Sequence, residues 1–422
     1  MASWVLPVFI VAFAFQYVVE TGLLLLNLRH VARARGVPPP LAGRVDDATA
    51  ERSRAYTLAN GRFSLAHGAF FAALTLAALL SGIMPALDAA LAARGLDGAH
   101  RFVVFLVALS LGFSAAGLPF AIFHTFVLEE RFGFNHTTPR LWVTDLLKGL
   151  LVQAAIGIPL LYATYGFMRF TGGLWWVWLF VFYTAVQLVL LWLYPTFIAP
   201  LFNRFQPLPE GTLRERLEAL ARAAGFAHRG LFVMDASRRS GHSNAYFTGI
   251  FRPRIVLFDT LVERMSVDEA ASVLAHEIGH YTARHVHRRL ALSVAATFVL
   301  LFALSRLVPW PPLYAAFGFD GPTLHAALAL VSLGGGAFVF WLAPFAAGLS
   351  RRHEYEADRY AVRLARAPEA LETALVRLNG ENLSNLHPHP WYSAWHYSHP
   401  VLVERIAAIQ RAAAEERPAA AG

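Results

Sequence analysis

Long apolar stretches alternate with shorter polar segments along most of this chain. A helix that crosses a bilayer needs about 20 mostly apolar residues. Seven stretches meet this requirement, near residues 4–28, 64–83, 101–126, 149–168, 174–198, 290–309 and 325–349. The first is longer than the roughly 7–15 residues of a signal-peptide core, and no basic residue precedes it. We therefore predict an integral-membrane protein with seven spans, of which the first is retained.

The segment 202–289 interrupts this pattern and has the periodicities of a soluble domain. Apolar residues at helical spacing over 212–224 predict an amphipathic helix. The runs 230–234 and 254–258 are short, apolar and bounded by turn residues, which predicts two strands. A further helix is expected from 266–269, where Ser-Val-Asp-Glu has the pattern of a capping box. This last helix is expected to continue into the sixth span.

These patterns divide the chain into five parts. The expected parts are 1–201 with spans one to five, 202–289 with the first half of the soluble domain, 290–349 with spans six and seven, 350–411 with the second half of that domain, and 412–422 as a disordered tail rich in Ala and Glu.

Composition supports the membrane assignment. The chain is 56% hydrophobic and 15% charged, against about 25% charged residues in a typical soluble protein. It has no cysteine, which excludes disulfides, thiolate metal sites and a cysteine nucleophile. Its net charge of +8 fits basic loops that stay on the cytoplasmic side of a membrane. No block of basic and aromatic residues suits single-stranded nucleic acid, so no nucleic-acid partner is expected.

The basic residues also predict an orientation. The loop after the first span holds seven arginines: Arg29, Arg33, Arg35, Arg44, Arg52, Arg54 and Arg62. The loop after the third span holds three basic residues, whereas those after the second and fourth hold two and one. Because basic loops stay in the cytoplasm, we expect the N-terminus outside and the soluble domain inside the cell.

Residues 276–280 read His-Glu-Ile-Gly-His. Two histidines four apart lie on one face of a helix and can bind one zinc ion, and Glu277 can then take a proton from water on the metal. So short a pattern also arises by chance on a surface helix. His285 and His287 follow closely, and we expect them to touch the ligands or an interface rather than to bind metal.

A catalytic zinc site needs a third protein ligand. Glu354 and Asp358, four residues apart just after the seventh span, are the candidates. One of them can bind zinc while the other accepts a hydrogen bond from a ligand histidine. His353 is the alternative ligand, and Glu356 is expected to be structural. The competing interpretation is a solvated, charged helix end.

Two other segments carry candidate chemistry. Residues 241–249 form a polar and aromatic strand whose edge could hold an extended peptide, with Ala245 and Tyr246 as substrate-binding residues. An ordinary hairpin strand is an equal alternative. His399, in the segment 395–400, could stabilise the oxyanion of a tetrahedral intermediate.

Together, and in this order among seven spans, these residues resemble the type I CAAX prenyl endopeptidases, a family of integral-membrane zinc metalloproteases. The resemblance is carried by HTFVLEERFGFNHTT at 124–138, IAPLFNRF at 198–205, SRRSGHSNAYFTG at 237–249, LFDTL at 257–261, AHEIGH at 275–280, SRRHEYEAD at 350–358 and YSHPVLVERI at 397–406. It covers almost the whole chain and is far more specific than the zinc motif alone.

The resemblance implies a mainly α-helical fold. Seven transmembrane helices would form a barrel around a water-filled chamber, capped by the zinc-peptidase domain with its small β-hairpin or sheet. One zinc ion per chain would be bound by His276, His280 and Glu354. Glu277 would act as the base and later as the proton donor.

The family also implies roles around the metal. Asp358 would orient a ligand histidine, and Asn244 and His399 would contact the substrate or its oxyanion. The expected activity is peptide-bond hydrolysis by a membrane metalloendopeptidase with CAAX-type C-terminal processing. The alternative is a quality-control protease or translocon-clearing factor that does not act on prenylated substrates.

The expected partners are a peptide or protein substrate, with a prenylated C-terminal peptide as one candidate, and the lipid bilayer. The chain is expected to be a monomer. Short loops and many Arg and Ala residues predict a bacterial inner membrane, or the endoplasmic reticulum for a eukaryotic chain, with the active site facing the cytoplasm.

Overall fold

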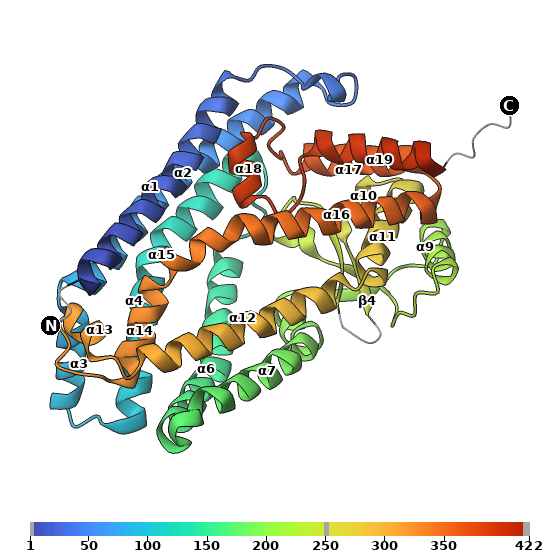
Figure 1. Cartoon of the computed structure of the whole chain (residues 1–422). Helices are drawn as coiled ribbons and strands as arrows, with labels where there is room; N and C mark the ends of the chain where they lie inside the picture. The colour runs from blue at the N-terminus through green and yellow to red at the C-terminus, as the bar shows by residue number, and fades with distance from the viewer. Residues whose placement is uncertain (1–3, 249–252, 417–422) are drawn as a thin grey trace, which may run out of the picture.

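The structure is a computed structural model that describes residues 4–248 and 253–416. Within these residues the chain is mainly α-helical with one small sheet (Figure 1). The long apolar helices lie together on one side, and the sheet with its covering helices lies on the other (Figure 1). The predicted fold class is confirmed.

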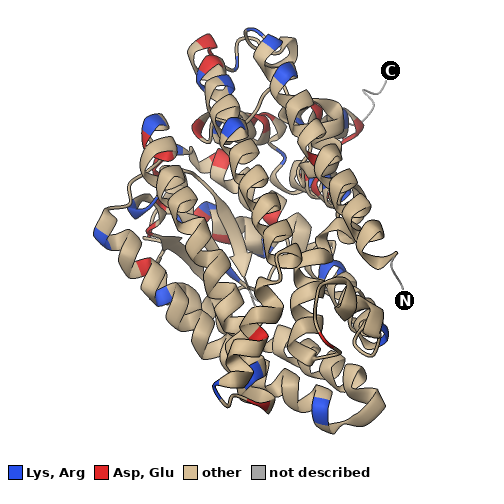
Figure 2. Ribbon diagram, turned by 90° about the vertical axis from the view of Figure 1, so that its left-hand side faces the viewer, with Lys and Arg blue, Asp and Glu red and all other residues tan. Residues whose placement is uncertain are grey.

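The described residues contain six helices long and apolar enough to cross a membrane, and a seventh, bent pair. They are α1 (Val5–Arg33), α2 (Asp47–Leu80), the run Gly98–Phe132 with α4 (Gly98–Phe123) and α5 (Glu130–Phe132), α6 (Pro139–Phe170), the run Gly172–Phe202 with α7 (Trp175–Leu193) and α8 (Ala199–Phe202), α12 (His285–Leu307), and α14 (Leu324–Gly334) followed by Gly336–Ala365. Each overlaps one predicted span. Figure 2 shows long tan stretches without charged residues along these helices.

The seventh span is bent by 41° between Gly334 and Gly336. Beyond the bend come α15 (Gly336–Val339), a short 3₁₀ turn and α16 (Ala343–Ala365). Consecutive glycines weaken a helix and favour such a kink. Because α16 continues from the membrane into the soluble domain, the boundary expected at 349 and 350 falls inside a single helix.

The described residues of the soluble domain form one four-stranded sheet of order β1-β2-β4-β3. The strands β2 (Leu231–Met234) and β4 (Arg254–Phe258) are parallel and match the two predicted strands. The terminal strands β1 (Phe205–Pro207) and β3 (Ala245–Thr248) pair antiparallel with β2 and β4. β1 was not predicted, because three residues that include a proline carry no strand pattern.

Helices pack around this sheet. The amphipathic α9 (Thr212–Ala223) packs against α11 (Val267–Thr282), and the short α10 (Asp259–Arg264) contacts β2 and β4. α11 begins with the predicted capping box, in which Ser266 and Glu269 each bond the other's backbone N–H. The C-terminal helices are α17 (Pro368–Glu381), α18 (Pro390–His396) and α19 (Leu402–Glu416). One apolar core joins both halves of the domain, with Leu257, Leu274, Leu375 and Ile409 among its buried side chains.

Two expectations about helix ends differ from the structure. α11 does not run into the sixth span: it ends at Thr282, Arg284 has a left-handed backbone (φ 56°), and α12 starts at His285. The tail expected to be disordered from 412 begins as helix, because α19 packs the buried Ala412 into the core and continues to Glu416. Residues 417–422, like Gly249 of the predicted strand, lie outside the described residues.

Candidate metal centre

The helices α11 and α16 bring His276, His280 and Glu354 together, with their ligand atoms within 4.8 Å of one another. The two Nε2 atoms of the histidines are 3.2 Å apart. Glu354 Oε2 lies 3.3 Å from His276 Nε2, and its Oε1 lies 3.3 Å from His280 Nε2. Ligands placed about 2.0–2.1 Å from zinc at tetrahedral angles are about 3.3–3.4 Å apart. The three side chains therefore fit one small metal ion.

The burial of Glu354 also supports a metal ion at this site. Its side chain is only 2% exposed, and its buried Oε2 has no hydrogen-bond donor among the described residues. A buried carboxylate oxygen without a donor is costly unless a cation binds it. The donor set of two imidazoles and one carboxylate is one that zinc accepts in catalytic sites.

Gly279 of the motif allows the two helices to approach. A Cβ atom there would lie 3.0 Å from Ala357 Cα and 3.1 Å from the Ala357 carbonyl oxygen. Since these are backbone atoms of α16, a larger residue must push α16 away from α11. The small residue at this position thus helps to hold Glu354 near the histidines.

We expect Gly279→Ala to lower thermal stability and weaken metal binding together, with a loss of about 1–3 kcal/mol in unfolding free energy. Gly166→Ala is the matched control, because a Cβ at that helical glycine meets nothing within 4 Å. Thermal unfolding and metal titration of both variants measure the effect. Unchanged metal affinity in Gly279→Ala would show that the approach of α16 does not limit the site.

Asp358 and Arg405 hold His276 in place. Asp358 Oδ1 lies 2.8 Å from His276 Nδ1. Arg405 binds the same carboxylate through two nitrogens, with Nε 2.9 Å from Oδ2 and Nη2 2.5 Å from Oδ1. A carboxylate that accepts the Nδ1 proton turns Nε2 towards the metal. The pairing of Arg405 with Asp358 was not predicted, since it depends on the packing of α19 against α16.

We expect Asp358→Asn to weaken metal binding about 10- to 100-fold while the protein stays folded, as for other groups that orient ligand histidines. Competitive titration with a metal chelator measures the affinity. Arg359→Gln is the control, because Arg359 is exposed and next to Asp358 on α16. Equal affinities for both variants would contradict the orienting role.

His280 is fixed by a second chain of contacts. Its Nδ1 lies 2.8 Å from His285 Nδ1, and His285 Nε2 lies 2.9 Å from Glu356 Oε2. The left-handed turn at Arg284 brings His285 back to His280. His353 stacks on His285, with ring centroids 4.0 Å apart, and is not one of the three clustered ligand residues. His285 therefore touches a ligand, as expected, and Glu356 acts through it.

Glu277 lies between the two histidines on α11 and is half-buried. Burial raises the pKa of Glu277 to about 7, with Glu354 adding to the rise and His276 opposing it. A carboxyl group that titrates near neutral pH is suited to exchange protons with a reacting water.

His399 lies on the open side of the cluster. Its Nε2 is 3.5 Å from Glu354 Oε1, while its side chain is 64% exposed. Ser398 Oγ contacts its other ring nitrogen at 3.0 Å. Arg351 fixes this segment, because its Nη1 donates to the carbonyls of Ala394 at 3.1 Å and Tyr397 at 2.8 Å. Arg351 precedes Glu354 by one helical turn, so α16 positions both sides of the cluster.

The predicted peptide-binding residues lie on the sheet. Asn244 is exposed, and its Oδ1 accepts a hydrogen bond from the backbone N–H of Ala245 at 2.8 Å. Ala245 is buried, and Tyr246 packs against Met234 and Val256. The Ala245 side chain thus belongs to the domain interior and that of Tyr246 is half-buried, which leaves the main chain of the terminal strand β3 as the main group that could meet a peptide.

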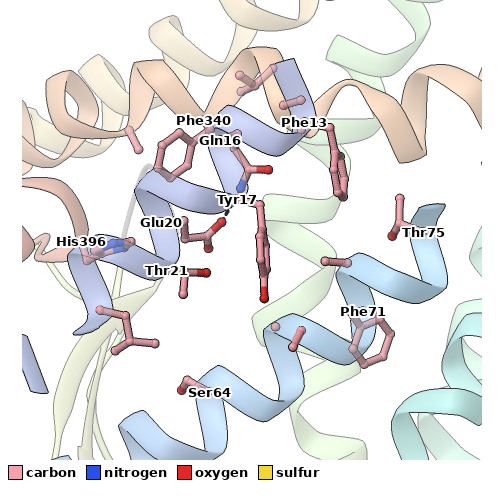
Figure 3. Close-up of a pocket in the computed structure, with 18 of the residues that line it drawn as sticks. Phe13, Gln16, Tyr17, Glu20, Thr21, Ser64, Phe71, Thr75, Phe340 and His396 are labelled. Carbon is pink, nitrogen blue, oxygen red and sulfur yellow. Dashed lines mark hydrogen bonds between the residues drawn. The ribbon is translucent and has the colours of Figure 1, made fainter. Parts of the chain in front are cut away.

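A cavity of about 790 Å³ lies between α1, α2 and the segment from α14 to α18. Figure 3 shows Gln16, Tyr17, Glu20 and Thr21 of α1 pointing into it, although α1 is a candidate membrane span. His396 of α18 also lines it, three residues before His399. Polar groups inside the membrane region fit a cavity that water can enter.

The fold and the site define an integral-membrane metallopeptidase, with a metal-binding His-Glu-x-x-His helix and a carboxylate supplied across two spans. Residues 27–204 match the family model described as CAAX prenyl protease N-terminal, five membrane helices. Residues 207–413 match Peptidase family M48. The chain belongs to peptidase family M48, which confirms the resemblance found in the sequence.

Relatives match over nearly the full length. The chain is 36% identical over 413 residues to the CAAX prenyl protease 1 homolog of Oryza sativa subsp. japonica, covering 94% of this chain and 95% of that protein. It is 36% identical over 424 residues to CAAX prenyl protease 1 of Saccharomyces cerevisiae, covering 93% and 92%. The crystal structure of S. mikatae Ste24p matches with a TM-score of 0.90 at 33% identity, covering 96% and 98%. These relatives are eukaryotic, and the bacterial inner membrane stays a prediction.

Proposed function

We propose that this chain is a zinc endopeptidase that cleaves prenylated peptides near their C-terminus, with one zinc ion per chain held by His276, His280 and Glu354. The observation that carries the proposal is the spacing of the three ligand atoms, 3.2 and 3.3 Å, which agrees with a tetrahedral zinc site. The names of the relatives support the choice of substrate.

A bound zinc ion would supply Lewis-acid chemistry, polarising the scissile carbonyl and making a water molecule more acidic. Glu277 accepts the proton of the attacking water and then passes it to the leaving amine. His399, exposed beside Glu354, donates a hydrogen bond to the developing oxyanion. Asp358 keeps the His276 ring in its binding orientation.

The substrate peptide is proposed to add to the open edge of β3. Such an addition uses main-chain hydrogen bonds, so it accepts many side chains. Asn244 stands exposed at the start of this edge and is suited to contact the peptide. Ala245 and Tyr246 would contribute their backbone groups.

An apolar cavity supports a prenylated substrate. It measures about 740 Å³, lies between α6, α7 and α12, and is also lined by Phe247 and Thr248 of β3. Leu190, Leu300 and Leu301 are among its walls. An isoprenoid chain attached to a peptide on β3 would have apolar surface beside it, and burial of that chain is favourable by about 25 cal/mol per Å².

The test compares one synthetic peptide with and without a farnesyl group, with cleavage followed by mass spectrometry. We expect the farnesylated peptide to be cut with a lower KM. Leu300→Trp, which fills the cavity, should remove that advantage, whereas Val299→Trp, also exposed on α12 but not part of the cavity lining, should keep it. Equal cleavage of both peptides by the unmodified protein would favour the general quality-control protease instead.

The charge distribution supports a cytoplasmic active site. The chain has no cysteine, so single introduced cysteines report sidedness without background. An impermeant thiol reagent should label Asp97→Cys in intact cells and Glu263→Cys only after the membrane is opened. The reverse pattern would invert the orientation.

The chain is further proposed to be a monomer, with the division into five parts given by the sequence. In this division the regions 202–289 and 350–411 form one catalytic unit, since Leu274 and Leu375 share the same buried core. That core holds the unit together across the sixth and seventh spans.

A further inference from the structure

A third cavity, of about 520 Å³, is lined by none of the residues of the metal cluster. It is formed where the first turns of α6, the end of α8 and the 3₁₀ turn Ala236–Arg238 meet. Two of these three segments are ends of candidate spans, and the third belongs to the soluble domain.

The walls of this cavity are strongly basic. Five cationic side chains line it: Arg140, Lys148, Arg204, Arg238 and Arg239. Asp145 pairs with Arg239 through both carboxylate oxygens, at 2.8 and 3.1 Å. Lys148 donates to the carbonyl oxygen of Leu201 at 2.8 Å.

Three of these cations have no acidic partner. Within residues 4–248 and 253–416, no ion pair involves Arg140, Arg204 or Arg238. Like charges gathered in one cavity repel one another at separations within the Debye length of about 8–10 Å. An anion that enters the cavity is therefore attracted by all three exposed guanidinium groups.

The start of α6 also favours the binding of an anion in this cavity. Thr138 caps the helix, and its hydroxyl accepts a hydrogen bond from the backbone N–H of Leu141 at 3.2 Å. The N-terminus of this 32-residue helix carries partial positive charge and backbone donors that suit phosphate. Its first turn opens on the same cavity as Arg204 and Arg238.

The surroundings place the anion at the level of lipid headgroups. Large apolar side chains are exposed beside the cations, with Val143 at 48%, Leu147 at 55% and Leu201 at 49% exposure. Such a surface faces acyl chains, whereas the basic groups at the helix ends face the polar layer. Basic pockets between membrane helices are typical sites for anionic lipid headgroups.

We propose that this cavity binds the phosphate headgroup of an anionic phospholipid. The headgroup would contact Arg140 on α6 together with Arg204 and Arg238 of the soluble domain, and its acyl chains would lie against Leu147 and Leu201. The lipid thus joins the sheet side of the soluble domain to the membrane helices. This binding does not depend on which peptide the enzyme cleaves.

The test is native mass spectrometry of the purified full-length protein in an equimolar mixture of phosphatidylglycerol and phosphatidylcholine. The variant Arg140→Gln/Arg204→Gln/Arg238→Gln removes the three unpaired cations and leaves Lys148 and Arg239 with their own partners. The control Arg94→Gln/Arg169→Gln/Arg306→Gln changes the net charge equally at exposed sites elsewhere. Arg238→Gln alone removes only one of the three cations, so a smaller loss of lipid binding is expected.

We expect the unmodified protein and the control to retain phosphatidylglycerol selectively. The triple variant should bind it about 100-fold more weakly and Arg238→Gln about fivefold more weakly, because each basic group contributes about one factor of five. Equal retention by the triple variant and the control would overturn the proposal. So would a rise in Tm with inorganic phosphate that matches the rise with phosphatidylglycerol, since the occupant would then be a soluble phosphate.

Discussion

Glu277→Gln is expected to lower kcat/KM for peptide hydrolysis by about 100- to 10,000-fold and to leave metal binding intact. The amide has nearly the same size but cannot accept the proton of the attacking water. Burial raises the pKa of the carboxyl group to about 7, so the native side chain can both take up and release a proton near neutral pH. Glu277 is not one of the three clustered residues that could hold the metal ion.

Cleavage assays on metal-loaded protein measure this effect, and metal content is determined on the same samples. Glu263→Gln is the control, because Glu263 is exposed on α10 in the same domain. Normal turnover by metal-loaded Glu277→Gln would contradict the role of Glu277 as the base.

Glu354→Gln is expected to weaken metal binding more than 100-fold, beyond the range of about 10- to 100-fold for groups that only orient a ligand. Glu354 is 2% exposed and contacts both histidines at 3.3 Å, so its negative charge is the one closest to the metal position. The amide keeps the shape of the side chain but removes this charge from the buried cluster.

Glu356→Gln provides the comparison on the same helix. Its carboxylate contacts His285 rather than the cluster itself, and its side chain is 49% exposed. We expect at most the smaller loss typical of an orienting group. Equal metal affinities for the Glu354 and Glu356 variants, measured by chelator competition, would rule out Glu354 as the third ligand.

The membrane spans and the pairs of residues around the metal site could be predicted from local patterns in the sequence. Span lengths follow from apolar runs, and the i, i+4 spacing marks both His276–His280 and Glu354–Asp358 as single-face pairs. The prediction that Glu354 rather than Asp358 binds the metal followed only from the family resemblance, because the choice depends on how α16 packs against α11. The structure places Glu354 nearest both histidines and Asp358 on the far side of His276.

Other features depended on backbone turns and long-range packing. The contact between His280 and His285 needs the left-handed Arg284, a conformation that a non-glycine residue rarely adopts. The sequence instead favoured an uninterrupted helix. Likewise, the roles of Arg351 and Arg405 depend on carbonyl groups and carboxylates that lie 43–47 residues away along the chain.

In the sequence, the unpaired arginines of this cavity indicate only an excess of positive charge in the loops. Arg140, Arg204 and Arg238 lie in separate segments, and each alone fits the ordinary excess of basic residues on one side of a membrane. These arginines line one cavity only because the fold brings together the start of α6, the end of α8 and the turn Ala236–Arg238.

We propose that a metal ion held between α11 and α16 enables this membrane protein to hydrolyse peptides. The most direct test of this proposal is cleavage of a farnesylated C-terminal peptide by the purified protein before chelation, after chelation and after zinc is restored. We predict that chelation abolishes release of the C-terminal fragment and that about one zinc ion per chain restores it, in the unmodified protein and not in Glu277→Gln. Cleavage that persists in fully chelated protein would contradict the account.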